Sequence, residues 1–168
     1  PTALASGDQT AFHYKANVSR PKNYENWSTL IQKLVSHWVD RYGLTEVQTW
    51  FFEVWSEPNL NVFGSGNKEE YFELYRHTAM AIKSVNKSLM VGGPATGANE
   101  WIEEFVAFCI SIELPPDFVS THHYPTDAFG KPGDDTQTQL SKSRRSVLRE
   151  QTMDVRRKAG DLPLDFPD

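Results

Sequence analysis

The 168-residue chain has little of what marks a disulfide-bonded, membrane-spanning or nucleic-acid-binding protein. Its single cysteine, Cys109, excludes a disulfide within the chain and a cysteine-rich metal site. No apolar run approaches the roughly 20 residues that a membrane span requires. The 17 basic and 22 acidic residues give a net charge of −5, so no broad positive surface is expected. We therefore expect neither a nucleic acid nor a membrane as a partner.

The chain also lacks an initiator methionine and a basic-then-apolar leader, since it opens with Pro1-Thr2-Ala3-Leu4. We expect these first residues to be the interior of a longer protein, and the sequence does not indicate a cellular compartment. The composition, with 39% hydrophobic and 23% charged residues, is typical of one soluble globular domain.

Apolar residues alternate along the chain between the period of a helix and that of a strand. Helices are predicted at residues 24–40, at 68–85, from an N-cap at Asn99 to Pro115-Pro116, and at 137–158. Strands are predicted at residues 47–55, at 89–91 before Gly92-Gly93-Pro94, at 117–121 and at 162–166. In the last helix, the residues expected to face inward are Leu140, Val147, Leu148 and Val155.

This alternation predicts an α/β fold, a parallel sheet with crossover helices. A doubly wound nucleotide-binding fold would carry a glycine-rich turn after its first strand, and neither Gly92-Gly93-Pro94 nor Gly64-Ser65-Gly66 has the required spacing. A (β/α)8 barrel of the TIM type places unusual residues at the C-terminal ends of strands, where Glu57 and His122 fall. We predict the barrel. Because a complete one takes roughly 250 residues, the chain would form about half of it.

The residues most suggestive of chemistry follow the first predicted strand. Glu57 is flanked by Trp55 and Phe63, so partial desolvation favours its protonated form and allows it to act as a general acid. Flat aromatic rings also suit the C–H faces of a sugar. Hydrolysis of a glycoside needs a second carboxyl group, roughly 5 to 9.5 Å from the first. Glu53 lies four residues earlier, roughly 13 Å away along the same strand, so the partner must come from another strand.

The segment Phe52-Glu53-Val54-Trp55-Ser56-Glu57-Pro58-Asn59-Leu60 resembles the acid/base motif of glycoside hydrolase family 39, the β-xylosidases and α-L-iduronidases. The resemblance to the xylosidase branch extends in order through residues 3–7, 41–43, 70–75, 91–95, 117–124 and 162–164. It implies a retaining enzyme on a (β/α)8 barrel, with catalytic glutamates on the fourth and seventh strands. Residues 1–168 would then be a partial catalytic domain, from the end of the third strand into the seventh.

The resemblance also implies roles for individual residues. Glu57 takes the acid/base position, and Asn59 follows it as in the family. Phe63 matches an aromatic residue that lines the sugar site. His122 and Tyr124 match a His-x-Tyr motif on the sixth strand that contacts the substrate and the nucleophile region.

Three positions depart from the family pattern. Ser56 replaces an asparagine and is too short to reach the sugar 2-hydroxyl, and Gly64 replaces a tryptophan. Asp168 stands at the nucleophile position in place of a glutamate, one methylene shorter. A displacement near 1 Å can lower a catalytic rate roughly a hundredfold. The alternative is that Asp168 belongs to a chain end without that role.

The adjacent His122 and His123 face opposite sides of a strand, so they cannot chelate one metal together. We expect no metal and no cofactor. The predicted activity is that of a retaining exo-glycosidase releasing xylose from non-reducing ends of β-xylosides and xylo-oligosaccharides. The alternative is a catalytically impaired fragment that binds sugar or serves in assembly. Within the enzymes, an α-L-iduronidase-like activity is the second choice. Open sheet edges would favour self-association or pairing with a complementary barrel segment.

Overall fold

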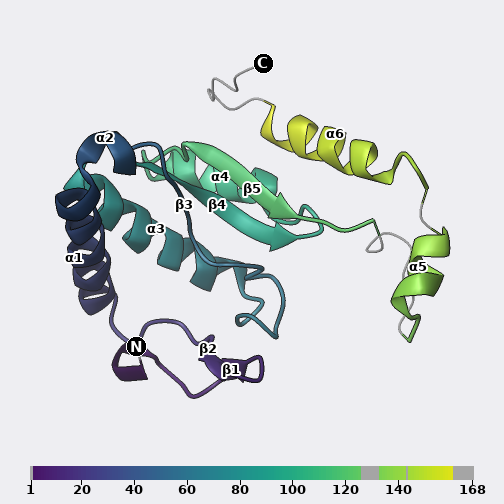
Figure 1. Cartoon of the computed structure of the whole chain (residues 1–168), viewed down its shortest axis with the longest axis horizontal. Helices are drawn as coiled ribbons and strands as arrows, with labels where there is room; N and C mark the ends of the chain where they lie inside the picture. The colour runs from purple at the N-terminus through teal and green to yellow at the C-terminus, as the bar shows by residue number, and fades with distance from the viewer. Residues whose placement is uncertain (1, 126–132, 143, 161–168) are drawn as a thin grey trace.

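The computed structural model describes residues 2–125, 133–142 and 144–160. Its centre is a parallel sheet of β3 (Phe51–Glu53), β4 (Met90–Gly97) and β5 (Phe118–His122), with β4 in the middle (Figure 1). A short antiparallel hairpin, β1 (Thr10–Ala11) and β2 (Ala16–Asn17), precedes this sheet in the sequence. The predicted strand at residues 162–166 lies outside the described residues.

The helices are α1 (Tyr24–Tyr42), α2 (Leu44–Val47), α3 (Lys68–Val85), α4 (Ile102–Ser111), α5 (Thr136–Lys142) and α6 (Val147–Ala159). The helices predicted at 24–40 and 68–85 are confirmed. Each begins at an asparagine, Asn23 or Asn67, whose side chain accepts a hydrogen bond from the backbone N–H three residues later. Among the described residues, no helix combines the length and the apolar character needed to cross a bilayer.

One hydrophobic core lies between the sheet and the helices α1, α3 and α4. Its buried residues include Val35, Tyr71, Phe72, Leu74, Tyr75, Ile82, Val91, Phe105 and Cys109. Tyr75 and Phe105 are fully buried and meet edge to face, with ring centroids 4.6 Å apart. Burying an apolar side chain of this size stabilises the fold by about 1.5–3 kcal/mol. The core therefore holds one face of the sheet against the helices.

The other face of β3 carries Phe51. Successive residues of a strand point to opposite faces, and Phe52 points to the core while Phe51 does not. Phe51 is 65% exposed, and its ring contacts that of Phe118 at a centroid distance of 5.2 Å. Within the described part of the chain the sheet has three strands and does not close into a barrel.

The strand predicted at residues 47–55 is correct only for its central part. Val47 is the last residue of α2 and is fully buried. A turn follows, in which the N–H of Trp50 donates to the carbonyl of Val47 at 3.1 Å. An apolar run of this length buries its side chains equally well from a helix or a strand, so periodicity could not separate the two.

The second strand is longer than predicted, because β4 continues through Gly92-Gly93-Pro94 to Gly97. These glycines allow close packing. A Cβ on Gly92 would lie within van der Waals overlap of the Phe118 carbonyl oxygen, and one on Gly93 would overlap the Tyr71 hydroxyl. The sequence predicted that the strand ends before these glycines, whereas they lie inside it and allow the approach of neighbouring elements.

The predicted helix at 137–158 is wrong as a single element, because α5 and α6 are separate helices. Leu140 and Leu148 are largely exposed, and of the four residues expected inside, Val147 is the one that is fully buried. Asn99 is not the N-cap of α4 either. That helix is preceded by Trp101, and the Asn99 side chain is used elsewhere.

Candidate active site

Glu57 follows β3 at the C-terminal end of the parallel sheet. The hydroxyl of buried Tyr71 donates to the carbonyl of Val54 at 3.1 Å and fixes the chain where the strand ends. The N–H of Glu57 then donates to the carbonyl of Ala95 at 2.7 Å, which ties the loop carrying Glu57 to β4. The C-terminal ends of parallel strands are where barrel enzymes carry out their chemistry. Glu57 therefore lies where the sequence predicted.

His122, the last residue of β5, faces the Glu57 carboxyl group. Its Nδ1 lies 3.3 Å from Oε1 of Glu57, whose side chain is only 15% exposed. With a proton on Nδ1, the imidazole donates to the carboxylate. With Nδ1 unprotonated, it accepts from the protonated acid. The contact can thus accompany both forms of Glu57 through which a general acid/base cycle passes.

The backbone around Glu57 adopts left-handed conformations that side chains rarely favour. Trp55 has φ of 70° and Glu57 of 49°, while Ala95, Ala98 and Asn99 after the middle of β4 have φ of 54°, 57° and 59°. Each such residue costs about 1–3 kcal/mol and persists only where its surroundings determine it. These residues lie on two segments, 55–57 and 95–99, which are joined by the hydrogen bond between Glu57 and Ala95. Such backbone conformations are often found at functional sites.

Asn59, predicted to contact substrate, has its side-chain amide committed to the end of β4. Its Oδ1 accepts from the N–H of Gly97 at 2.9 Å. Its Nδ2 donates to the Gly97 carbonyl at 3.2 Å and to the Glu100 carboxylate at 3.0 Å. A sugar contact for Asn59 stays a prediction. In this structure the residue holds the loop of Glu57 in place.

Phe63 is half-buried and held near Glu57 by its backbone, since its carbonyl accepts from the Trp55 indole N–H at 2.7 Å. Its ring stacks on Phe12 from the β1–β2 hairpin at a centroid distance of 5.3 Å. Gln9 reinforces this approach by donating to the carbonyl of Asn61 at 3.0 Å. Phe12 was not predicted as a site residue from the sequence. The only signal was a short stretch dense in aromatic residues, because no local pattern shows which loop a hairpin will contact.

The remaining predicted site residues are either exposed or outside the described residues. Ser56 is exposed beside Glu57. Tyr124 is 58% exposed, two residues beyond His122, and its carbonyl accepts from Gln151 at 3.5 Å. Asp168 lies outside the described residues. The structure thus brings Glu57 and His122 together and leaves the nucleophile position undescribed.

Two other titratable groups, His123 and Cys109, take structural positions. His123 turns away from His122, and its Nδ1 lies 2.9 Å from Oδ1 of Asn99. Burial raises the pKa of the Cys109 thiol to about 12, so it is a packed, protonated core residue. In residues 2–125, 133–142 and 144–160, no three His, Cys, Asp or Glu side chains converge as metal ligands would.

Parallel βα units with an enclosed carboxyl group at a strand's C-terminal end are the arrangement of the (β/α)8 glycoside hydrolases. Comparison with known proteins gives the family. The model for glycosyl hydrolases family 39 matches residues 1–167, and the chain belongs to this family. The resemblance drawn from the sequence motifs is confirmed.

Individual relatives agree with this assignment. The chain is 47% identical to a β-xylosidase of Caldicellulosiruptor saccharolyticus, over 99% of this chain and 34% of that protein. It is 55% identical to a β-xylosidase of Geobacillus stearothermophilus, over 76% of this chain and 26% of that protein. The crystal structure of a monomeric β-xylosidase from Caulobacter crescentus matches with a TM-score of 0.85 and 38% identity, over 98% of this chain and 33% of that one. The chain spans about a third of the length of these relatives, and its fold is part of their TIM barrel.

Proposed function

We propose that this chain carries the acid/base part of a retaining exo-glycosidase that releases xylose from the non-reducing ends of β-xylosides and xylo-oligosaccharides. The observation that carries the proposal is the contact between Glu57 and His122, 3.3 Å apart at the C-terminal ends of two strands of one parallel sheet. The choice of xylose is supported by the relatives, which are named β-xylosidases.

In the first step, Glu57 donates its proton to the glycosidic oxygen while the bond from that oxygen to the anomeric carbon breaks. A second carboxylate, at or near Asp168, attacks the anomeric carbon and forms a glycosyl ester. In the second step, ionised Glu57 takes a proton from water as the water oxygen attacks the anomeric carbon and displaces that carboxylate. Two inversions give net retention of configuration.

The second candidate is a sugar-binding or assembly fragment without turnover. It is favoured by the sheet, which has three strands in the described part and does not close. Such a fragment would keep Glu57, His122 and Phe63 on one wall of a cleft while another polypeptide segment supplies the opposite wall. An α-L-iduronidase-like activity is the next choice among enzymes.

Release of 4-nitrophenol from its β-xyloside by the purified 168-residue chain separates the candidates. The enzyme proposal expects turnover, with β-xylose as the first product seen by proton NMR. No turnover, together with saturable binding of xylobiose by calorimetry, would replace the enzyme with the binding fragment. Preference for an aryl α-L-iduronide over the xyloside would favour the iduronidase-like alternative.

A further inference from the structure

The last residues of β4 and those that follow it, residues 95–99, contact both residues of the candidate acid/base pair. On one side, the carbonyl of Ala95 accepts a hydrogen bond from the N–H of Glu57 at 2.7 Å. On the other, the N–H of Ala98 donates to the carbonyl of His122 at 2.7 Å. The relative position of Glu57 and His122 therefore depends on how residues 95–99 are held.

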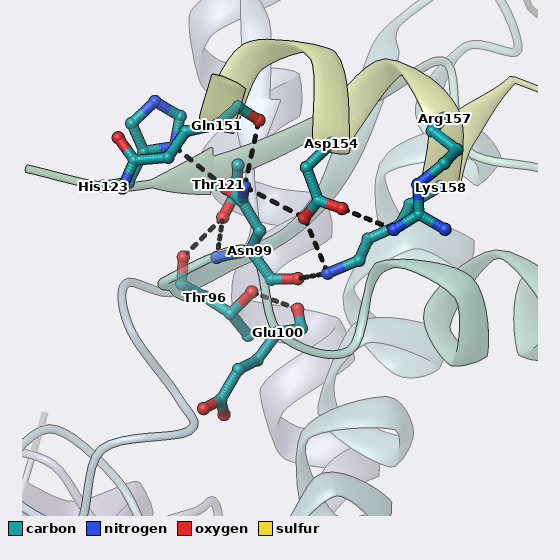
Figure 2. A network of polar contacts seen from close by, with 9 residues as sticks. All are labelled: Thr96, Asn99, Glu100, Thr121, His123, Gln151, Asp154, Arg157 and Lys158. Atoms are coloured by element: carbon teal, nitrogen blue, oxygen red, sulfur yellow. Dashed lines mark hydrogen bonds and ion pairs between the residues drawn. The ribbon is translucent and has the colours of Figure 1, made fainter. Parts of the chain in front are cut away.

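Asn99 lies at the centre of the polar network that holds this segment (Figure 2). Its side chain is almost fully enclosed, with the residue 4% exposed, and its φ is 59°. Its Oδ1 lies 2.9 Å from Nδ1 of His123, and its backbone N–H donates to the Thr121 hydroxyl at 3.2 Å. That hydroxyl in turn donates to the carbonyl of Thr96 at 2.8 Å.

Residues 98 and 99 thus contact three consecutive residues at the end of β5, positions 121, 122 and 123. Side chains that follow one another along an extended chain point to opposite sides. His123 is held on the side of Asn99, and His122 is directed to the side of Glu57. Rotation of this segment would move both imidazoles together.

Helix α6 holds Asn99 from the other direction (Figure 2). Nδ2 of Asn99 donates to the carbonyl of Gln151 at 3.1 Å. Lys158 donates to the carbonyl of Asn99 at 3.0 Å and forms an ion pair with Asp154 at 2.9 Å. Residues of α6 therefore bind the side-chain NH2 group and the backbone carbonyl of Asn99. The side-chain Oδ1 of Asn99 remains for His123.

We propose that Asn99 and His123 are positioning residues that set the contact between His122 and Glu57, with α6 as the support of Asn99. The positioning of His122 by Asn99 and His123 rests on these contacts alone. Its consequence for catalysis rests on the proposed function: with Asn99 or His123 removed, His122 would no longer accompany Glu57 through its protonation cycle.

The test compares His123→Ala with His123→Asn, because an asparagine amide can donate from nearly the position of the imidazole Nδ1. The readout is the proton and nitrogen NMR signals of the His122 ring in the full chain, assigned by their loss in His122→Gln. We expect His123→Ala and Asn99→Ala to shift these signals towards their positions in Glu57→Ala. His123→Asn should keep them near the wild-type positions.

Asn23→Ala is the matched control, since it removes an asparagine whose side chain bonds within the first turn of α1 and is not part of the network in Figure 2. It should leave the His122 signals in place. Unchanged His122 signals in His123→Ala would overturn the proposal, and so would an equal shift in His123→Asn. If Asn99→Ala does not fold, the two His123 variants decide the matter.

Kinetics provide the second readout. Where the wild type turns over, His123→Ala should lower kcat for poor leaving groups about tenfold, with KM within twofold, and His123→Asn should recover most of it. Equal loss on poor and activated leaving groups would overturn the catalytic part. A wild-type chain without turnover would contradict the proposed function, whereas the NMR comparison would still decide the positioning role.

Discussion

Gly92 occupies a point where β4 and β5 leave no room for a side chain. A Cβ there would meet the carbonyl oxygen and the ring of Phe118, and a carbonyl oxygen cannot move away without disturbing the sheet. The same strand leads to Ala95, which accepts the N–H of Glu57. Packing at this residue and the geometry of the site are therefore linked.

Gly92→Ala should destabilise the fold by about 1–3 kcal/mol or more, since it overpacks a rigid backbone contact. Gly7→Ala is the control, because its Cβ would make an ordinary contact at 3.7 Å with Ser19, and it should stay within about 0.5 kcal/mol of wild type. Urea unfolding followed by circular dichroism measures both. Equal stability of the two variants would show that β4 and β5 can separate at Gly92.

Ser56 is the second residue with a testable consequence. It is exposed beside Glu57, where the family resemblance implies an asparagine that reaches the sugar 2-hydroxyl. Ser56→Asn should raise kcat/KM for β-xylosides about tenfold, which corresponds to about 1.4 kcal/mol of transition-state stabilisation. The matched substrates are the 2-deoxy analogues, which should respond little. A similar gain on both would remove the 2-hydroxyl from the explanation.

At the scale of elements, the sequence predicted best where local signals and tertiary packing agree. Helices α1 and α3 have asparagine caps and clear apolar stripes, and the predicted residue ranges match the observed helices. The strands were harder to predict. Gly92 and Gly93 are typical of a turn when taken locally, but they lie inside β4 because two other elements approach there. Propensity cannot reveal such a contact.

The candidate site was predictable in part for the same reason. Glu57 and His122 lie at strand ends, and their meeting follows from parallel topology together with the family motifs. The functions of Asn99 and Phe12 depend on contacts with residues 22 to 59 positions away in the sequence. No local pattern contains those contacts.

Helix α6 has a pH-dependent cluster of ion pairs at Asp154, formed between residues of the helix itself. The hydrogen bond from Lys158, followed by one from Arg157, lowers the pKa of this carboxyl group. A lowered folded-state pKa gives stability that is present above the unfolded-state pKa and is lost as the pH falls through the folded-state value. Asp154→Asn should therefore cost about 0.2–1 kcal/mol at pH 7, the range for partly exposed pairs.

That difference between wild type and Asp154→Asn should shrink as the pH falls below about 4, where the unfolded carboxyl begins to bind its proton. Urea unfolding at pH 7, 5 and 3 gives the three values to compare. A difference that is constant across these pH values would contradict an ionic role for Asp154.

At the scale of the whole molecule, Phe51 marks an apolar surface on the face of the sheet that the described helices leave exposed. It is 65% exposed and lies on β3, an edge strand of the described sheet. Apolar edge strands tend to pair with other chains. We expect the purified chain to associate with itself, or with a complementary barrel segment when one is present.

Phe51→Ser should shift the chain towards monomer, as measured by size-exclusion chromatography with light scattering at about 10–100 µM. Met80→Ser is the control, because Met80 is also exposed but lies on α3, away from the sheet edge. A wild-type chain that stays monomeric throughout this range would contradict the association. An equal effect of both substitutions would remove the sheet face from the explanation.

The most direct test of the account is the leaving-group dependence of Glu57→Gln. If Glu57 is the general acid, the variant should lose on the order of a hundredfold or more in kcat/KM on alkyl xylosides and xylobiose, whose leaving groups need a proton. It should lose far less on dinitrophenyl xyloside, whose leaving group departs as an anion. An equal loss on both kinds of substrate would remove Glu57 from the acid role and contradict the account.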